Sequence, residues 1–345
     1  MIGLLQVLIE AVHLVCVNFA AAAPLLAAGL EWRSARTGDP RLVWAARRMA
    51  QLALVALALG AVLGLTMAGL LYWQLGSDYA ASLRRLPTAR YLYAVAELAF
   101  YVLSMLACVV LLPGPEACDS LRRWAGRLLA LAAATNVLYH FPPLFAVLVG
   151  LRGEPTGPPL SAVELKALRL DPLVLAFLVH HVLAAVAVTG TGLMLLASRN
   201  PPAVDPARQK ADPLVQIGAW CALVPTLLQW IVGMVVLAQL SPAGRGALLG
   251  GDLLATALFG GALFATLGLL HLLAAVAFGP AEPRAAWRAA GMLMLVILLM
   301  VGTLQRSRAA ERRAVRTRKT AASLPLPSCP TPVVPFQQKG YAHVG

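Results

Sequence analysis

The sequence predicts an all-α protein that crosses a membrane about eight times, and its composition is the first observation behind that prediction. Apolar residues make up 60% of the 345 residues, charged residues make up only 12%, and the mean hydropathy is +0.76. Soluble domains carry about 25% charged residues, so this chain has too little charge to cover a water-exposed surface. The composition therefore excludes a soluble enzyme, a nucleic-acid-binding domain and a disordered chain.

The second observation is a series of apolar segments, each close to the ~20 residues that a helix needs to cross the hydrocarbon core. Turn-forming stretches rich in Gly and Pro, such as residues 153–159 (GEPTGPP), separate them. The connection at residues 241–247 is very short, so we expect the two helices that it joins to be antiparallel neighbours. The segments cover residues 3–29, 49–74, 91–112, 124–150, 172–197, 214–240, 248–278 and 288–305.

A basic tail, residues 306–345, follows the predicted membrane domain of residues 1–305. The tail holds eight of the 28 Lys and Arg residues and one of the 15 Asp and Glu residues. Its second half is rich in Pro and poor in large apolar side chains, which is typical of disorder. We therefore expect a disordered tail that meets anionic lipid or an acidic partner subunit.

The distribution of Lys and Arg predicts the orientation in the membrane. The odd-numbered connections carry more basic residues than the even-numbered ones, which places the N-terminus outside and residues 33–48 in the cytoplasm. Eight crossings then put the tail outside, whereas its own basic charge favours the cytoplasm. The first apolar segment lacks a basic leader, so we expect it to remain as a helix of the inner (cytoplasmic) membrane.

Few ionisable residues lie inside the predicted membrane segments, where such groups are costly and usually functional. At 1.5 Å per residue, His13 and His181 fall roughly 15 Å, and Glu97 roughly 10 Å, below the same outer face. Three potential metal ligands therefore share one half of the bilayer. The full set is Glu10, His13, Glu97, His140, His180, His181 and His271.

This set favours a haem protein, because neutral imidazole is a strong axial ligand for iron. Two other interpretations remain open. The histidines can be packing residues or can line a polar pathway in a haem-free transporter or structural subunit. Glu10 and His13 also form an E-x-x-H pattern, as in di-iron carboxylate bundles, although such a site needs a second motif and two further carboxylates, and only Glu97 is available.

Several local sequences resemble subunit I of the cytochrome bd quinol oxidases. Residues 64–67 (GLTM) and 72–79 (YWQLGSDY) are similar to the end of that family's second helix, and residues 179–190 (VHHVLAAVAVTG) are similar to its fifth. The likeness covers roughly residues 5–200, in order and with similar spacing. Within it, three residues fall where the family has functional ones: His13, Glu97 and Asn136.

The resemblance implies a redox protein of a respiratory chain that carries haem b, or haem b with haem d. His13 and Glu97 would be the axial ligands of one haem. His181 would be one ligand of a low-spin haem b, because His180 points about 100° away on the same helix.

The sixth ligand of the low-spin haem would come from His140, Met234 or Met300, and His140 would give a bis-imidazole haem. Oxygen would be reduced at the other haem, with protons delivered through polar residues such as Asn136 and Glu10.

The second half of the chain departs from the family. The family's long loop between helices six and seven, which helps to bind quinol, is here reduced to residues 241–247. The resemblance therefore implies electron transfer without quinol oxidation. We expect a second membrane subunit and a cytochrome c-like donor as partners.

Overall fold

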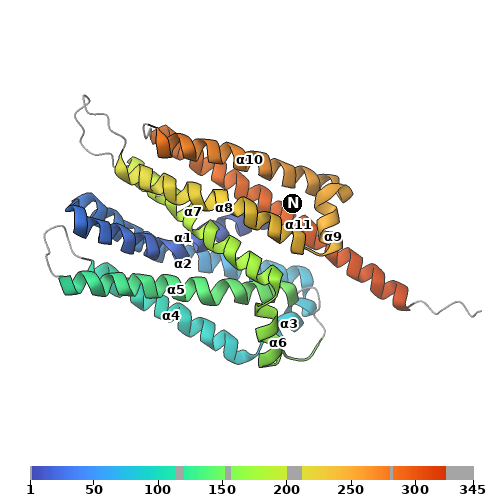
Figure 1. The fold of residues 1–345 in the computed structure, drawn as a ribbon. Helices are drawn as coiled ribbons and strands as arrows, with labels where there is room; N and C mark the ends of the chain where they lie inside the picture. The colour runs from blue at the N-terminus through green and yellow to red at the C-terminus, as the bar shows by residue number, and fades with distance from the viewer. Residues whose placement is uncertain (1, 113–119, 152–156, 200–211, 280–282, 324–345) are drawn as a thin grey trace, which may run out of the picture.

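The computed structural model describes residues 2–112, 120–151, 157–199, 212–279 and 283–323 (Figure 1). These residues form helices and connecting turns, and no strand occurs in the described ranges. Eight of the helices are long and apolar enough to cross a membrane. The predicted fold class, an all-α multi-pass membrane protein, is confirmed.

The eight long helices follow the predicted apolar segments in order. Three short helices join some of them: α3 (Ser77–Arg84), α6 (Ala162–Arg169) and α9 (Pro242–Gly246), the last followed by the π-helical turn η2 (Ala247–Gly251). The long helices are α1 (Ile2–Thr37), α2 (Pro40–Leu75), α4 (Thr88–Leu111), α5 (Ser120–Leu151), α7 (Pro172–Arg199), α8 (Pro213–Gln239), α10 (Leu253–Phe278) and α11 (Pro283–Ser323).

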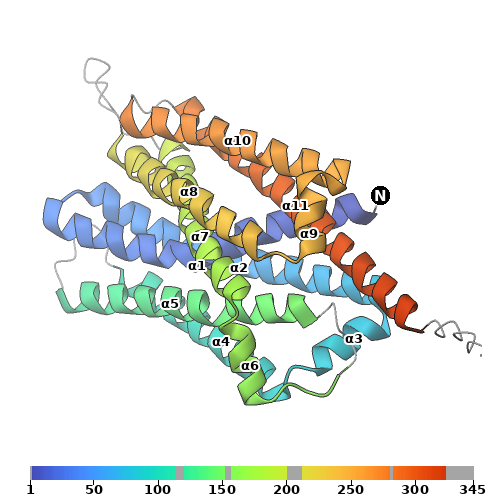
Figure 2. The same cartoon turned by 45° about the vertical axis from the view of Figure 1, so that its right-hand side comes forward.

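The helices are arranged in a bundle around α1, which packs against α2, α5 and α7 (Figures 1 and 2). Helices α4 and α5 lie on one side of α1, and α8, α10 and α11 lie on the other. The short helices α3, α6 and α9 all lie at the end of the bundle where α1 begins (Figure 2). The short connection between α8 and α10 makes them antiparallel neighbours, as predicted.

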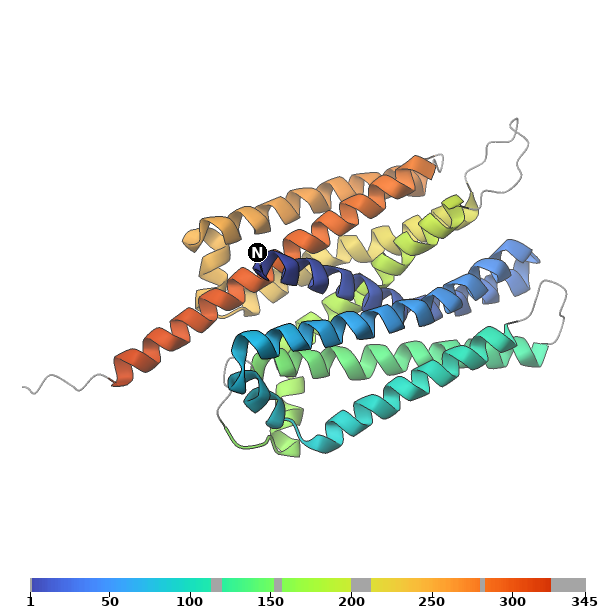
Figure 3. The ribbon, with the colours of Figure 1, turned by 180° about the vertical axis from the view of Figure 1, so that it is seen from behind.

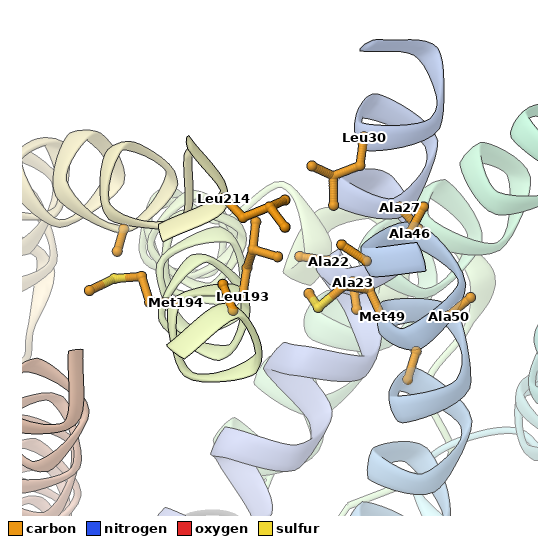
Figure 4. Packing of buried hydrophobic residues seen from close by; sticks show 14 of the residues in the cluster. Ala22, Ala23, Ala27, Leu30, Ala46, Met49, Ala50, Leu193, Met194 and Leu214 are labelled. Atoms are coloured by element: carbon orange, nitrogen blue, oxygen red, sulfur yellow. The ribbon is translucent and has the colours of Figure 1, made fainter. Parts of the chain in front are cut away.

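Small side chains form the core between the central helices. Ala22 and Ala23 of α1, Ala46 and Met49 of α2 and Leu193 of α7 are almost fully buried and belong to one cluster (Figure 4). Membrane helices approach closely where their contact faces carry small residues. Helices α7 and α8 approach each other closely in this way, since a Cβ atom added at Gly190 would lie 2.6 Å from the carbonyl oxygen of Gly218.

The last helix, α11, is longer than the sequence predicted, and it projects beyond the bundle (Figure 3). The prediction of a disordered tail from residue 306 is wrong as far as Ser323. Residues 306–323 are rich in Ala and Arg, which favour helix, and they extend a helix that is already nucleated. Arg306 also pairs with Asp252 at the start of α10, at 2.5 Å. Residues 324–345, the Pro-rich part of the tail, lie outside the described residues.

Candidate functional site

His13 of α1 is fixed by a contact with the next helix. Its Nδ1 atom lies 2.8 Å from the carbonyl oxygen of Gly60 on α2. A carbonyl oxygen can only accept a hydrogen bond, so Nδ1 carries the ring proton and the lone pair of the neutral ring is on Nε2. Histidines that bind metals commonly donate their other ring N–H to a backbone carbonyl in this way. His13 is therefore held in a tautomer that can ligate iron.

Two glycines of α2, one helical turn apart, make room for this arrangement. A Cβ atom added at Gly64 would lie 3.0 Å from Cε1 of His13, and one added at Gly60 would lie 2.9 Å from a methyl carbon of Val17. Larger side chains at these positions would push α1 away or turn the ring. The Gly64 of the GLTM segment thus has a direct structural role beside His13.

The adjacent residues His180 and His181 of α7 have different surroundings. The Nε2 atom of His180 lies 3.5 Å from the side-chain nitrogen of Gln229 on α8. His181 is the next residue of α7, a helix that packs against α1 as well as α8. Within the described residues, the Nδ1 atom of His180 is buried without a hydrogen-bond partner. Of the two rings, that of His180 is the one next to α8.

Glu97 of α4 forms a second polar cluster with residues of α5. Its Oε1 atom lies 3.5 Å from Nε2 of His140. The side chain of Asn136 donates a hydrogen bond to the backbone carbonyl of Glu97, at 3.1 Å. In the part of the chain that the structure describes, no polar contact joins Glu97 to His13 or His140 to His181. That His13 and Glu97 ligate the same haem therefore stays a prediction. That His140 is the sixth ligand of the low-spin haem stays a prediction as well.

Glu10 connects α1 to the last membrane helix. Its carboxylate accepts a hydrogen bond from Nε2 of Gln305 on α11, at 2.8 Å. Glu10 lies three residues before His13, on the same side of α1. His271 is exposed on α10 and takes no part in these clusters. Among the described residues, no group of three or more His, Cys, Asp and Glu side chains could hold a metal ion, as a di-iron carboxylate site would require.

A buried ion pair that the sequence did not predict lies at the opposite end of the bundle. Glu31 of α1 is fully buried and forms a salt bridge with Arg127 of α5, and Arg123 lies 3.9 Å from the same carboxylate. A buried carboxylate needs such a partner. The available signal was an acidic residue directly after the first apolar segment, although the sequence does not show which later helix supplies the arginine.

The comparisons with known proteins bear on the fold. No family model matches the sequence, and no curated protein matches it either. Among solved structures, the chain is similar to a chain of the bd oxidase from Geobacillus thermodenitrificans, with a TM-score of 0.63 and 11% sequence identity. The match covers 90% of this chain and 86% of that one. At this identity, the comparison shows a fold like that of a bd oxidase chain.

Proposed function

We propose that this protein is a haem-binding membrane protein of a respiratory chain, a reduced relative of subunit I of the bd oxidases. It would pass electrons between haems towards oxygen or a partner redox subunit. The observation that carries the proposal is the His13 ring, whose Nδ1–H is bonded to Gly60 and whose Nε2 is available to a metal. The bd oxidase-like fold and the similar sequence at residues 179–190 support it.

The residues present fit haem ligation by imidazole. A bound haem would supply an iron that accepts and returns one electron. His13 would ligate the oxygen-reactive haem, a haem d or haem b, and His181 would ligate a low-spin haem b. The glycines of α2 would let the His13 ring keep its orientation. The apolar side chains of the surrounding helices would exclude bulk water.

An acidic side chain would transfer protons to the site of oxygen reduction. Reduction of oxygen to water consumes protons, which must reach a dry site through polar side chains. Glu10 lies one helical turn from His13 and is oriented by Gln305. Glu97 pairs with His140 beside a pocket at the membrane boundary, and Asn136 fixes the backbone at Glu97. We propose that Glu10 gives and takes protons, with Asn136 as a positioning residue beside Glu97, the predicted second ligand of the His13 haem.

The electron donor is proposed from the short connection between α8 and α10. Only α9 and η2 occupy it, ten residues from Pro242 to Gly251. A lobe that encloses a quinol ring needs a longer segment. A second membrane subunit and a cytochrome c-like donor, in the inner membrane, are therefore the proposed partners.

Oxygen uptake by the purified full-length chain tests the donor and the acceptor together. We expect uptake with a reduced c-type cytochrome, or with an artificial one-electron donor, and little uptake with ubiquinol or menaquinol analogues. Robust quinol-driven turnover that quinol-site inhibitors block would contradict the donor assignment. If dithionite-reduced protein failed to reoxidise in air, the assignment of oxygen as acceptor would be wrong.

A further inference from the structure

A small pocket lies between α4 and α5, at the end of the bundle where α1 begins. Two arginines line it: Arg90 is the third residue of α4, and Arg169 is the last residue of α6. Helix α6 lies beside the first turn of α4 (Figures 2 and 3). Both arginines therefore lie at the level where the chain enters the membrane, which is the level of the lipid phosphates.

Within the described ranges, neither guanidinium group forms an ion pair with an acidic side chain. Among the described residues, Nε of Arg169 is buried without a hydrogen-bond partner, and no ion pair involves Arg90 or Arg169. Burial and the nearby charge of Arg90 lower the pKa of Arg169. A buried, unpaired donor beside a like charge is costly, so an anion bound in this part of the pocket would stabilise the two arginines.

Glu97, the carboxylate that lines the pocket, does not neutralise the two arginines. Glu97 is paired with His140 and lies seven residues further along α4 than Arg90, about 10 Å deeper. The apolar and aromatic residues that line the pocket include Tyr93, which is 63% exposed, and Tyr139 near Arg169 is 71% exposed. In a bilayer, such exposed aromatic side chains would meet lipid. The pocket thus combines an anion-binding end with an apolar path into the membrane.

We propose that Arg90 and Arg169 bind the phosphate of an anionic phospholipid headgroup in this pocket. The planar guanidinium groups match phosphate oxygens with paired N–H donors. Basic pockets between membrane helices are known to select anionic headgroups. The acyl chains would continue along the exposed aromatic side chains of α4 and α5. This site does not depend on whether the protein binds haem.

Native mass spectrometry of the full-length chain tests the proposal. The protein would be exposed to equal amounts of dioleoyl phosphatidylglycerol and dioleoyl phosphatidylcholine. We expect at least tenfold preferential retention of phosphatidylglycerol by the wild type. The double variant Arg90→Gln/Arg169→Gln should lose the preference. The matched control is Arg84→Gln, which removes an exposed arginine of α3 outside the pocket and should keep it.

Two further measurements make the outcome specific. The double variant Arg90→Lys/Arg169→Lys keeps the charge but loses the paired, planar N–H donors of the guanidinium groups, so it should retain an intermediate amount of lipid. This variant also tests the proposal if the Gln variant does not fold. Inorganic phosphate at equal concentration should not displace the lipid, and displacement would contradict the lipid assignment. Equal retention of the two lipids, or full retention by folded Gln variants, would overturn the proposal.

Discussion

At the scale of single residues, the proposed function depends on how each histidine of the membrane-spanning helices uses its two ring nitrogens. His13 donates one N–H to a backbone carbonyl and keeps the other nitrogen available, which suits a metal ligand. His140 pairs with a carboxylate instead, which suits proton exchange. The surroundings of each ring therefore favour metal ligation for His13 and proton exchange for His140, although both residues are histidines.

The first prediction concerns His13. The variant His13→Ala should lose one haem per protein, because its ring is the ligand with an available Nε2. The pyridine haemochromogen assay measures haem content directly. Glu97→Gln should weaken the same centre and leave the low-spin haem intact. The control His271→Ala removes an exposed histidine of α10 and should bind haem as the wild type does; unchanged haem in His13→Ala would refute the assignment.

The second prediction separates His181 from His180. The resemblance of residues 179–190 to the bd oxidase family implies that His181 is the ligand, and the ring of His180 is next to Gln229 on α8. Low-temperature EPR should therefore show loss of the low-spin haem signal in His181→Ala and its retention in His180→Ala. The opposite pattern would overturn the alignment of residues 179–190 with the bd oxidase family.

At the scale of secondary-structure elements, the site is positioned by helix pairs that contact each other through small residues or through ion pairs. The pair α1–α2 brings Gly60 and Gly64 against His13. The start of α10 is held to α11 by Asp252, which bonds to Arg306 and lies 3.6 Å from Arg313. Each contact can be tested by a conservative substitution.

The third prediction tests the glycine contact. Gly64→Ala places a methyl group 3.0 Å from the His13 ring, so the ring must move and its bond to Gly60 must weaken. Loss of such a supporting contact lowers metal affinity by about 10- to 100-fold, and a haem titration of the apoprotein measures it. Gly69→Ala on the same helix meets nothing within 4 Å and should bind haem normally. Equal affinities in the two variants would contradict the role of Gly64.

The fourth prediction concerns Asp252 and acid stability. A hydrogen bond from the backbone N–H of Ala255, and then the bond and charge of Arg306, lower the pKa of Asp252. The stabilisation is therefore complete above the ordinary aspartate pKa of about 3.9 and is lost as the pH falls through the lower value in the fold.

The measurement is the melting temperature between pH 7 and strongly acidic pH. Asp252→Asn keeps the helix cap but removes the charge, so the variant should melt earlier at neutral pH and show a smaller loss on acidification. Asp78→Asn, on the exposed surface of α3, serves as the control. Identical pH profiles for Asp252→Asn and the wild type would show that the α10–α11 ion pair does not contribute.

The sequence predicted the elements better than their contacts. Apolar runs report which segments lie in the membrane, so all eight long helices were predicted in order. Hydropathy does not report lateral neighbours, so the pairs Glu97–His140 and Glu31–Arg127 could not be predicted. The helical extension of α11 was not predicted because an Arg-rich composition is typical of a disordered tail. A helix that has already formed can nevertheless extend into such a segment.

At the scale of the whole molecule, an even number of crossings places both ends of the described chain on one side of the membrane. Helix α11 ends at the same end of the bundle as α3, α6 and α9 (Figure 2). The basic extension of α11 and the two arginines of the lipid pocket therefore lie on that same side. This shared basic surface suits an anionic leaflet or an acidic partner.

The optical spectrum of the purified full-length chain tests the central claim, haem binding, most directly. Protein produced with an adequate haem supply should show a Soret band and, after reduction with dithionite, the alpha band of haem b, with or without that of haem d. The double variant His13→Ala/His181→Ala, still helical by circular dichroism, should lose these bands. A helical wild-type protein that shows neither band would contradict the account and would indicate a haem-free transporter or structural subunit.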